Sequence, residues 1–234
     1  MGLLIEGVDA WNAWRQAHKK DAPMDLSEAD LSGMALRGIN FSGVDLYHAN
    51  LIGTNLAKSN LTNSYLIGAV ITGNLEDANL SGANLYGSTL AFANLTGAQM
   101  VGANLIDANL NGSNLTKVDL RRSDLSHALL WGVDLSESNL SEAILWHSRF
   151  FRAKMNRCNC QNADFSHAIL SGASLRYANL RAANLTNTDL SKADLSHSDL
   201  EEVQMRKTNL SEALLLEAKL PAALDLVGDR RRSP

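Results

Sequence analysis

No run of about 18 apolar residues occurs in the 234-residue chain, although 45% of its residues are hydrophobic. A helix that crosses a membrane needs about 20 such residues, so we expect no membrane-spanning segment. The N-terminus also lacks the charged and then apolar stretch of a secretory signal. We therefore predict a cytoplasmic protein that does not bind membranes.

Cysteine is equally scarce, because Cys158 and Cys160 are the only two in the chain. Both fall on positions of the repeat described below that should point inward. A structural zinc site takes four ligands as a rule, and this pair supplies two. We expect both thiols to pack as small hydrophobic groups and expect no metal site here.

Motifs of catalysis are absent as well. The sequence contains no phosphate-binding glycine loop, no nucleophile elbow and no paired zinc-ligand motif. A rod filled with leucine, which the repeat indicates, has no deep cleft for a reaction. We predict that the protein is not an enzyme and uses no cofactor.

What the chain does contain is a five-residue repeat. From Leu26 to Leu220 almost every fifth residue is large and apolar, and the residue two before it is small; residues 78–82 read Ala-Asn-Leu-Ser-Gly. Neither a helix of 3.6 residues per turn nor a strand of period two keeps two residues of every five on one side. The pattern, with 40 such central residues, indicates a repeat architecture.

The unit resembles the consensus of the pentapeptide-repeat family, Ala-(Asp/Asn)-Leu-x-x, over about 195 residues. The resemblance implies an all-β fold, a right-handed quadrilateral β-helix in which four units make one square coil. Residues 24–220 would then form about ten coils. With a rise of ~4.8 Å per coil, the rod would be roughly 50 Å long.

Both ends of such a rod expose backbone edges that need covering. We predict that residues 1–23 form an N-terminal capping helix over 3–19, with Leu4, Val8, Trp11, Trp14 and Ala17 on its apolar side. Residues 221–234 are predicted to form a C-terminal cap and tail, with a short helix that starts at Pro221.

One irregularity interrupts the count, because Ile71 and Leu75 are four residues apart rather than five. We expect a local tight corner here. Gly73 is expected to supply the backbone freedom that this corner needs.

If four units make a coil, outward residues sort into four sides, which we name A to D after the units centred on Leu26, Leu31, Leu36 and Phe41. Sides A and B carry fourteen large apolar side chains, and C and D carry four. Side A has Tyr47, Tyr65, Ile67, Tyr86, Ile106, Ile144 and Trp146. Side B has Ile52, Val70, Phe92, Leu129, Trp131, Phe151 and Ile169.

Aromatic residues that gather on an exposed surface are typical of protein interfaces. We therefore predict a non-enzymatic scaffold or regulator that binds a protein partner through sides A and B, with Trp131, Trp146 and Phe151 as anchors. The alternative is that these side chains form ladders that only stiffen the rod. The candidate interaction residues are Tyr47, Tyr86, Ile106, Leu129, Trp131, Ile144, Trp146 and Phe151.

A column of His127, His147 and His167 stands on side A, each two residues after its centre. Imidazoles ~5 Å apart could bind a metal or sense pH. Because no carboxylate stands closer in this column than Asp107, we favour a surface ladder of mostly neutral histidines.

Known members of the family include DNA mimics that bind DNA gyrase, and this is our alternative function. From Met24 to Leu220 the chain has 20 acidic and 15 basic residues, whereas ~50 Å of B-DNA carries roughly 30 negative charges. The resemblance to DNA is therefore poor. Since acidic residues interrupt the basic ones, we also expect no direct binding to nucleic acid.

A homodimer is a further prediction. Leu214 and Leu216 are expected to point outward in a terminal coil, beside an apolar tail. Relatives often dimerise through that end, so we predict a dimer contact at these two leucines.

Overall fold

A tight turn closes each five-residue unit of the chain, of which the computed structural model describes residues 2–18 and 24–222. In the unit centred on Leu46, the N–H of Ala49 donates to the carbonyl of Leu46 at 3.0 Å. The second turn residue, His48, has a φ of 51°. A positive φ at this position is what a type II turn requires, so each turn redirects the chain by one side.

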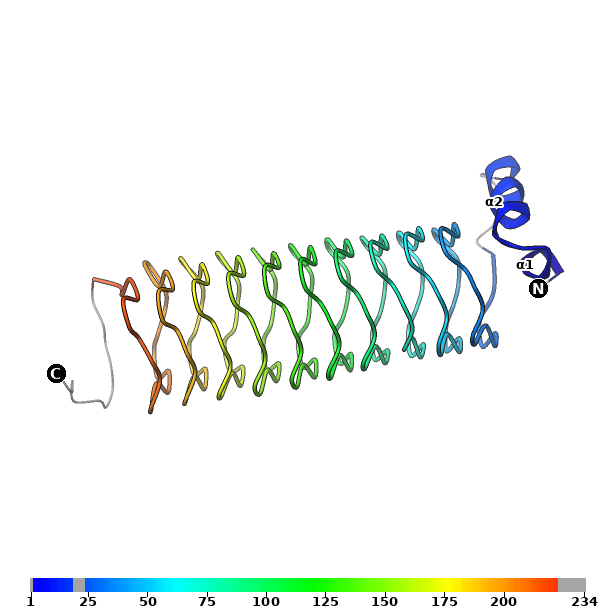
Figure 1. Ribbon diagram of the computed structural model, residues 1–234. Coiled ribbons are helices and arrows are strands. Elements are labelled where there is room, and N and C mark those ends of the chain that lie inside the picture. The colour runs from blue at the N-terminus through cyan, green and yellow to red at the C-terminus, as the bar shows by residue number, and fades with distance from the viewer. Residues whose placement is uncertain (1, 19–23, 223–234) are drawn as a thin grey trace.

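Backbone hydrogen bonds join each unit to the units one coil before and one coil after it. The N–H of Leu46 donates to Tyr65 O at 2.8 Å, and the N–H of Asp45 donates to Met24 O at 2.9 Å. Parallel bridges link residues that are twenty apart, from Asp25 with Asp45 onward. Four units therefore make one coil, and the coils stack into a solenoid β-helix (Figure 1).

The core of the solenoid consists of the central residues and the small residues two before them. Leu46, Leu51 and Ala49 are fully buried, and the same holds along most of the rod. Cys158 and Cys160 are buried in this core as free thiols, which confirms the inward position predicted for them. Side chains fill the interior, so any ligand must bind on the outside of the coils.

The four sides keep their order through the four-residue unit. Asn55 pairs with Asn74, nineteen residues on, and the spacing returns to twenty where Asn74 pairs with Asn94. The residues assigned to sides A and B by counting therefore do stack along the same sides. The expected reason for Gly73 is wrong, however. Its φ is not positive; a Cβ here would lie 2.0 Å from the backbone oxygen of Thr54.

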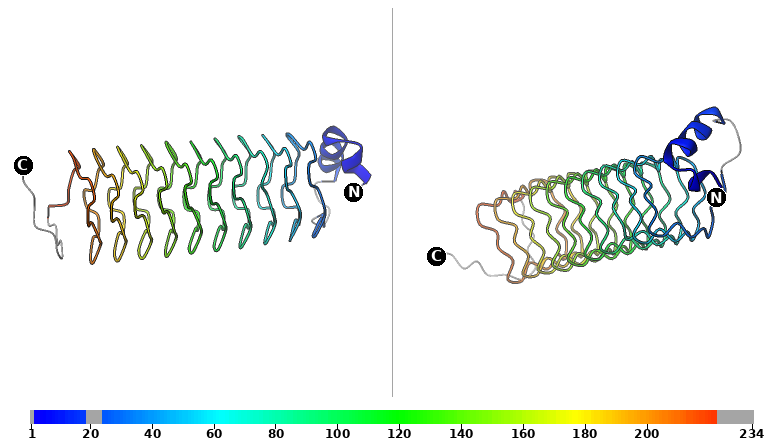
Figure 2. Two further views of the ribbon diagram at one scale, coloured as in Figure 1. Left: turned by 60° about the horizontal axis from the view of Figure 1, so that its bottom comes forward. Right: turned by 45° about the vertical axis from the view of Figure 1, so that its right-hand side comes forward.

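Two helices precede the first coil instead of the single helix expected over residues 3–19. These are α1 (Gly2–Ile5) and α2 (Val8–Ala17), and they lie at one end of the stack (Figure 2). The break falls at Gly7, whose φ of 105° is foreign to a helix. Trp11 is fully buried, and its indole N–H donates to Asn40 O at 2.7 Å. Ala17, expected on the apolar side, is exposed.

Several finer expectations stay predictions. These are the right-handed sense of the coils, their number and the capping role of the two ends. The helix predicted from Pro221 falls mainly on residues outside the described part of the chain. Among the described residues, no helix is long and apolar enough to span a lipid bilayer.

Candidate protein-docking surface

Most of the candidate interaction residues are exposed on sides A and B. Tyr47, Tyr86, Trp131, Ile144 and Trp146 are exposed, whereas Ile106, Leu129 and Phe151 are half-buried. They do not form one cluster. Tyr47 lies five coils from Trp146 along side A, about 24 Å at the usual spacing between strands.

The middle of the rod brings the largest members together. Trp131 and Phe151 stand one above the other on side B, with ring centroids 5.5 Å apart. Trp131 nevertheless remains 58% exposed. Its backbone is fixed, because its N–H donates to the Asn111 side-chain oxygen at 2.8 Å. Trp131 is thus a large aromatic group on a rigid support that leaves much of its surface open to a partner.

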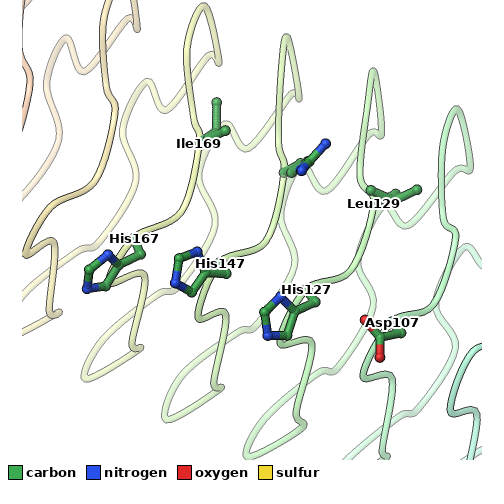
Figure 3. Close-up of a pocket in the computed structure, with 7 residues that line it drawn as sticks. Asp107, His127, Leu129, His147, His167 and Ile169 are labelled. Carbon is green, nitrogen blue, oxygen red and sulfur yellow. The ribbon is translucent and has the colours of Figure 1, made fainter.

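Trp146 contacts the histidine column at the corner between sides A and B. Its indole meets the imidazole of His147 edge to face at 4.3 Å and that of His127 at 4.9 Å. The three histidines lie in a row along successive coils (Figure 3). Their rings stack, with centroids 5.4 Å apart for His127 and His147 and 4.8 Å apart for His147 and His167.

Stacked imidazoles do not suit a metal ion. Ring nitrogens bind a metal through lone pairs in the plane of the ring, and the planes of His127 and His147 are parallel within 2°. The nitrogens of these two rings therefore do not converge on one point. Among residues 2–18 and 24–222, no group of three histidine, cysteine or acidic side chains is placed to hold a metal.

The stacking also affects protonation. Partial burial, and next the positive charge that His167 and His127 would carry, lower the pKa of His147 below the usual value. A positive charge on the middle ring is the least favourable in such a row. Stacking in the row therefore disfavours protonation of the central imidazole.

An open groove of about 360 Å³ runs between the histidine column and the next column of side B. The wall of histidines and the opposite row are seen together in Figure 3. Its lining combines apolar, cationic and titratable groups: Asp107, His127, Leu129, His147, Arg149, His167 and Ile169. Trp131, Trp146 and Phe151 are not among the residues that line this groove.

Charge is distributed unevenly among the coils. Residues 143–163, which are one coil of twenty residues and the first residue of the next, contain Arg149, Arg152, Lys154 and Arg157 but no acidic residue. We call this segment the basic coil. Trp146, His147 and Phe151 belong to it as well, so the aromatic surface and the positive charge coincide.

At the far end of the rod, Leu214 and Leu216 are exposed by 59% and 65%. Their outward position on side C agrees with the expectation from the repeat. The bridge between Asp194 and Leu214 places them on the last coil that the structure describes on that side.

A comparison with known families assigns the chain. The family model of pentapeptide repeats matches it in eight copies, over residues 25–63, 74–112, 83–122, 119–157, 158–196 and 178–215. The chain belongs to the pentapeptide-repeat family. This membership confirms the resemblance drawn from the repeat unit, and it indicates no catalytic family.

Solved structures similar to this chain are also pentapeptide-repeat proteins. HetL, involved in heterocyst differentiation regulation in the cyanobacterium Nostoc sp. strain PCC 7120, shares 28% identity over 93% of this chain and 97% of its own, with a TM-score of 0.49. QnrB1, a plasmid-mediated fluoroquinolone resistance protein, shares 17% identity over 86% of this chain and 83% of its own, with a TM-score of 0.43. With TM-scores below 0.5, neither structure indicates which partner this chain binds. No match was found among the curated proteins.

Proposed function

We propose that this pentapeptide-repeat protein is a non-enzymatic scaffold or regulator that binds a protein partner through sides A and B. The observation that supports this most is the exposure of Trp131 and Trp146 at the middle of a rigid rod. Large aromatic residues dominate the energetics of protein interfaces when a partner buries them. The central residues of the core are mostly leucine along the whole rod. The outward positions vary from unit to unit, so they are where a binding surface can differ from the rest of the repeat.

The competing interpretation is a ladder that only stiffens the rod. A ladder of that kind gains its stability from burial between neighbouring coils. Trp131 contacts Phe151 and yet remains 58% exposed, while the neighbour on its other side in the column, Asn111, is polar. The exposed part of the indole contributes nothing to a ladder, and this supports docking.

A capture experiment tests the proposal. The parent protein, the variant Trp131→Ala/Trp146→Ala and the control Val101→Ala are used as baits in an extract of the source cells. Val101 suits the control because it is a half-buried apolar residue on side D, outside the two sides proposed to bind. We expect at least one protein to be recovered with the parent and the control but lost with the double variant. If all three baits recover the same proteins, the aromatic surface is not the docking site.

Binding to DNA gyrase as a DNA mimic remains the alternative proposal. The basic coil counts against it, since four cations without an acidic neighbour in the coil would be repelled by a channel built for DNA. A supercoiling assay decides between the two. The scaffold proposal predicts no change in gyrase activity, or in its inhibition by a quinolone, at micromolar protein.

We also propose self-association through Leu214 and Leu216, which can act alongside the scaffold role. Two exposed leucines on one coil are the kind of apolar patch that a second copy can cover. This contact lies three coils from the basic coil, so it leaves the aromatic surface free.

A further inference from the structure

We propose that the basic coil, residues 143–163, binds an acidic segment of the partner, an extended stretch of chain that carries several carboxylates around an apolar side chain. The inference rests on the proposed docking function and adds the chemistry of what docks. It follows from three observations: the charge of adjacent coils, the lack of internal partners for the cations and the aromatic groups beside them.

The charge changes sign abruptly between two coils. Residues 123–142 contain four acidic residues and no Lys or Arg. The basic coil that follows contains four cations and no acid, on a chain whose formal net charge is −4. This separation gives the surface a defined positive band.

Outside the basic coil, seven of the eleven cations in residues 24–220 pair with a carboxylate, whereas three of the four in the basic coil do not. Arg122 lies 2.8 Å from Glu142, and Arg176 lies 2.9 Å from Asp194. Within the described part of the chain, no carboxylate lies within 4.0 Å of Arg149, Arg152 or Arg157. Three guanidinium groups are thus available to an outside anion. The fourth cation, Lys154, has a loose contact with Asp134 at 3.7 Å.

Aromatic rings hold these cations in place and offer an apolar contact beside them. The Arg152 guanidinium lies 5.1 Å from the centre of the Phe151 ring, and that of Arg157 lies 5.7 Å from the Tyr177 ring. A guanidinium stacked on a ring keeps its edge free for bidentate contact with a carboxylate. Trp131, beside Phe151, provides the surface for an apolar side chain of the same segment.

The shape of the band favours a peptide over a nucleic acid. One coil is only ~4.8 Å high, which matches a single extended strand that crosses side B and turns onto side C. A duplex presents phosphates over a much taller surface. It would meet Asp124, Asp134, Glu137 and Glu142 of the preceding coil, where repulsion opposes binding.

The test uses two blocked seven-residue peptides with a fluorescent label. One alternates Glu with Leu around a central Phe, and its counterpart has Lys in place of Glu. Affinity for the full chain is measured by fluorescence anisotropy at about 20 mM and about 150 mM salt. We expect the acidic peptide to bind, the basic one to bind at least about tenfold more weakly, and the affinity to fall as salt rises.

Charge reversal locates the contact. Arg149→Glu/Arg152→Glu should raise the Kd of the acidic peptide by at least about tenfold, which corresponds to about 1.4 kcal/mol. The control Arg37→Glu/Lys58→Glu changes the net charge equally, at exposed cations that have no carboxylate within 4.0 Å among the described residues. It should change the Kd less than about twofold. Circular dichroism of each variant shows that the fold is intact.

Equal affinity for both peptides, or equal loss in both charge variants, overturns the proposal. It is also overturned if a duplex DNA of random sequence binds more tightly than the acidic peptide and depends on Arg149 and Arg152. These failures differ from failure of the docking function. If Trp131→Ala/Trp146→Ala abolishes partner capture and Arg149→Glu/Arg152→Glu does not, the docking surface is supported but the proposal that it binds an acidic segment is wrong.

Discussion

Substituting Gly73 by alanine should destabilise the rod far more than the same change at Gly132, a glycine in a regular turn. Gly73 lies in the only unit that is one residue short, and a Cβ there would lie 2.0 Å from the backbone oxygen of Thr54. That oxygen already accepts a hydrogen bond from the N–H of Asn74 at 3.0 Å. The neighbouring coils must therefore move apart to admit one methyl group.

The expected cost combines two effects. Separation of the coils weakens two backbone hydrogen bonds, that from Asn74 to Thr54 and that from Asn94 to Gly73 at 3.1 Å. Each contributes about 1 kcal/mol net, and a forced shift in a packed interior costs ~1–3 kcal/mol. We expect Gly73→Ala to lower the free energy of unfolding by about 4 kcal/mol.

Gly132→Ala is the matched control. Gly132 has a φ of +60° with nothing within 4 Å of a Cβ, so only the backbone strain of alanine applies, ~1–2 kcal/mol. Equilibrium unfolding in urea, followed by circular dichroism, measures both variants. Destabilisation that is equal within about 0.5 kcal/mol would refute the close approach of the two coils at Gly73.

Three further outcomes are expected. In an NMR titration the His147 imidazole should protonate at a lower pH in the folded protein than in the unfolded chain, because partial burial and the neighbouring His167 and His127 lower its pKa. A lowered pKa costs stability as pH falls below the unfolded value of 6.5, so His147→Gln should lose less stability than the parent between pH 7 and pH 5. Cys158 and Cys160 should react with iodoacetamide only after unfolding, because both are buried and burial raises the pKa of the Cys160 thiol; rapid alkylation of the native protein would contradict this. Sedimentation equilibrium should give a dimer that Leu214→Asp/Leu216→Asp converts to a monomer, and a monomeric parent ends that proposal.

The interior of the rod could be predicted because each five-residue unit states which side chains point inward. Counting by twenties placed Trp131 and Phe151 on one side, and the bridges confirm the register even across the short unit. The break at Gly7 was missed because the apolar spacing of Leu4 and Trp11 resembles one continuous helix. Only the φ of 105° at Gly7 shows that the chain turns there.

The chemistry of the surface was harder to predict. Arg121 lies about one and a half coils before Arg149 and Arg152, and it pairs with Asp119 at 2.7 Å, whereas these two have no such pair in the described part of the chain. Whether a cation pairs with a carboxylate one coil away depends on the rotamers of both side chains. The five-residue repeat does not determine these rotamers. The sequence does contain a signal for the basic coil, because no acidic residue occurs between Glu142 and Asp164.

Site-specific photo-crosslinking tests the docking surface most directly. A photoreactive phenylalanine analogue is introduced at position 131 on side B or, as a control, at position 101 on side D, and the protein is irradiated in an extract of the source cells. We predict a discrete crosslinked product from position 131, lost on competition with excess unlabelled parent, and none from position 101. Equal products from both positions, or none from position 131, would contradict the account.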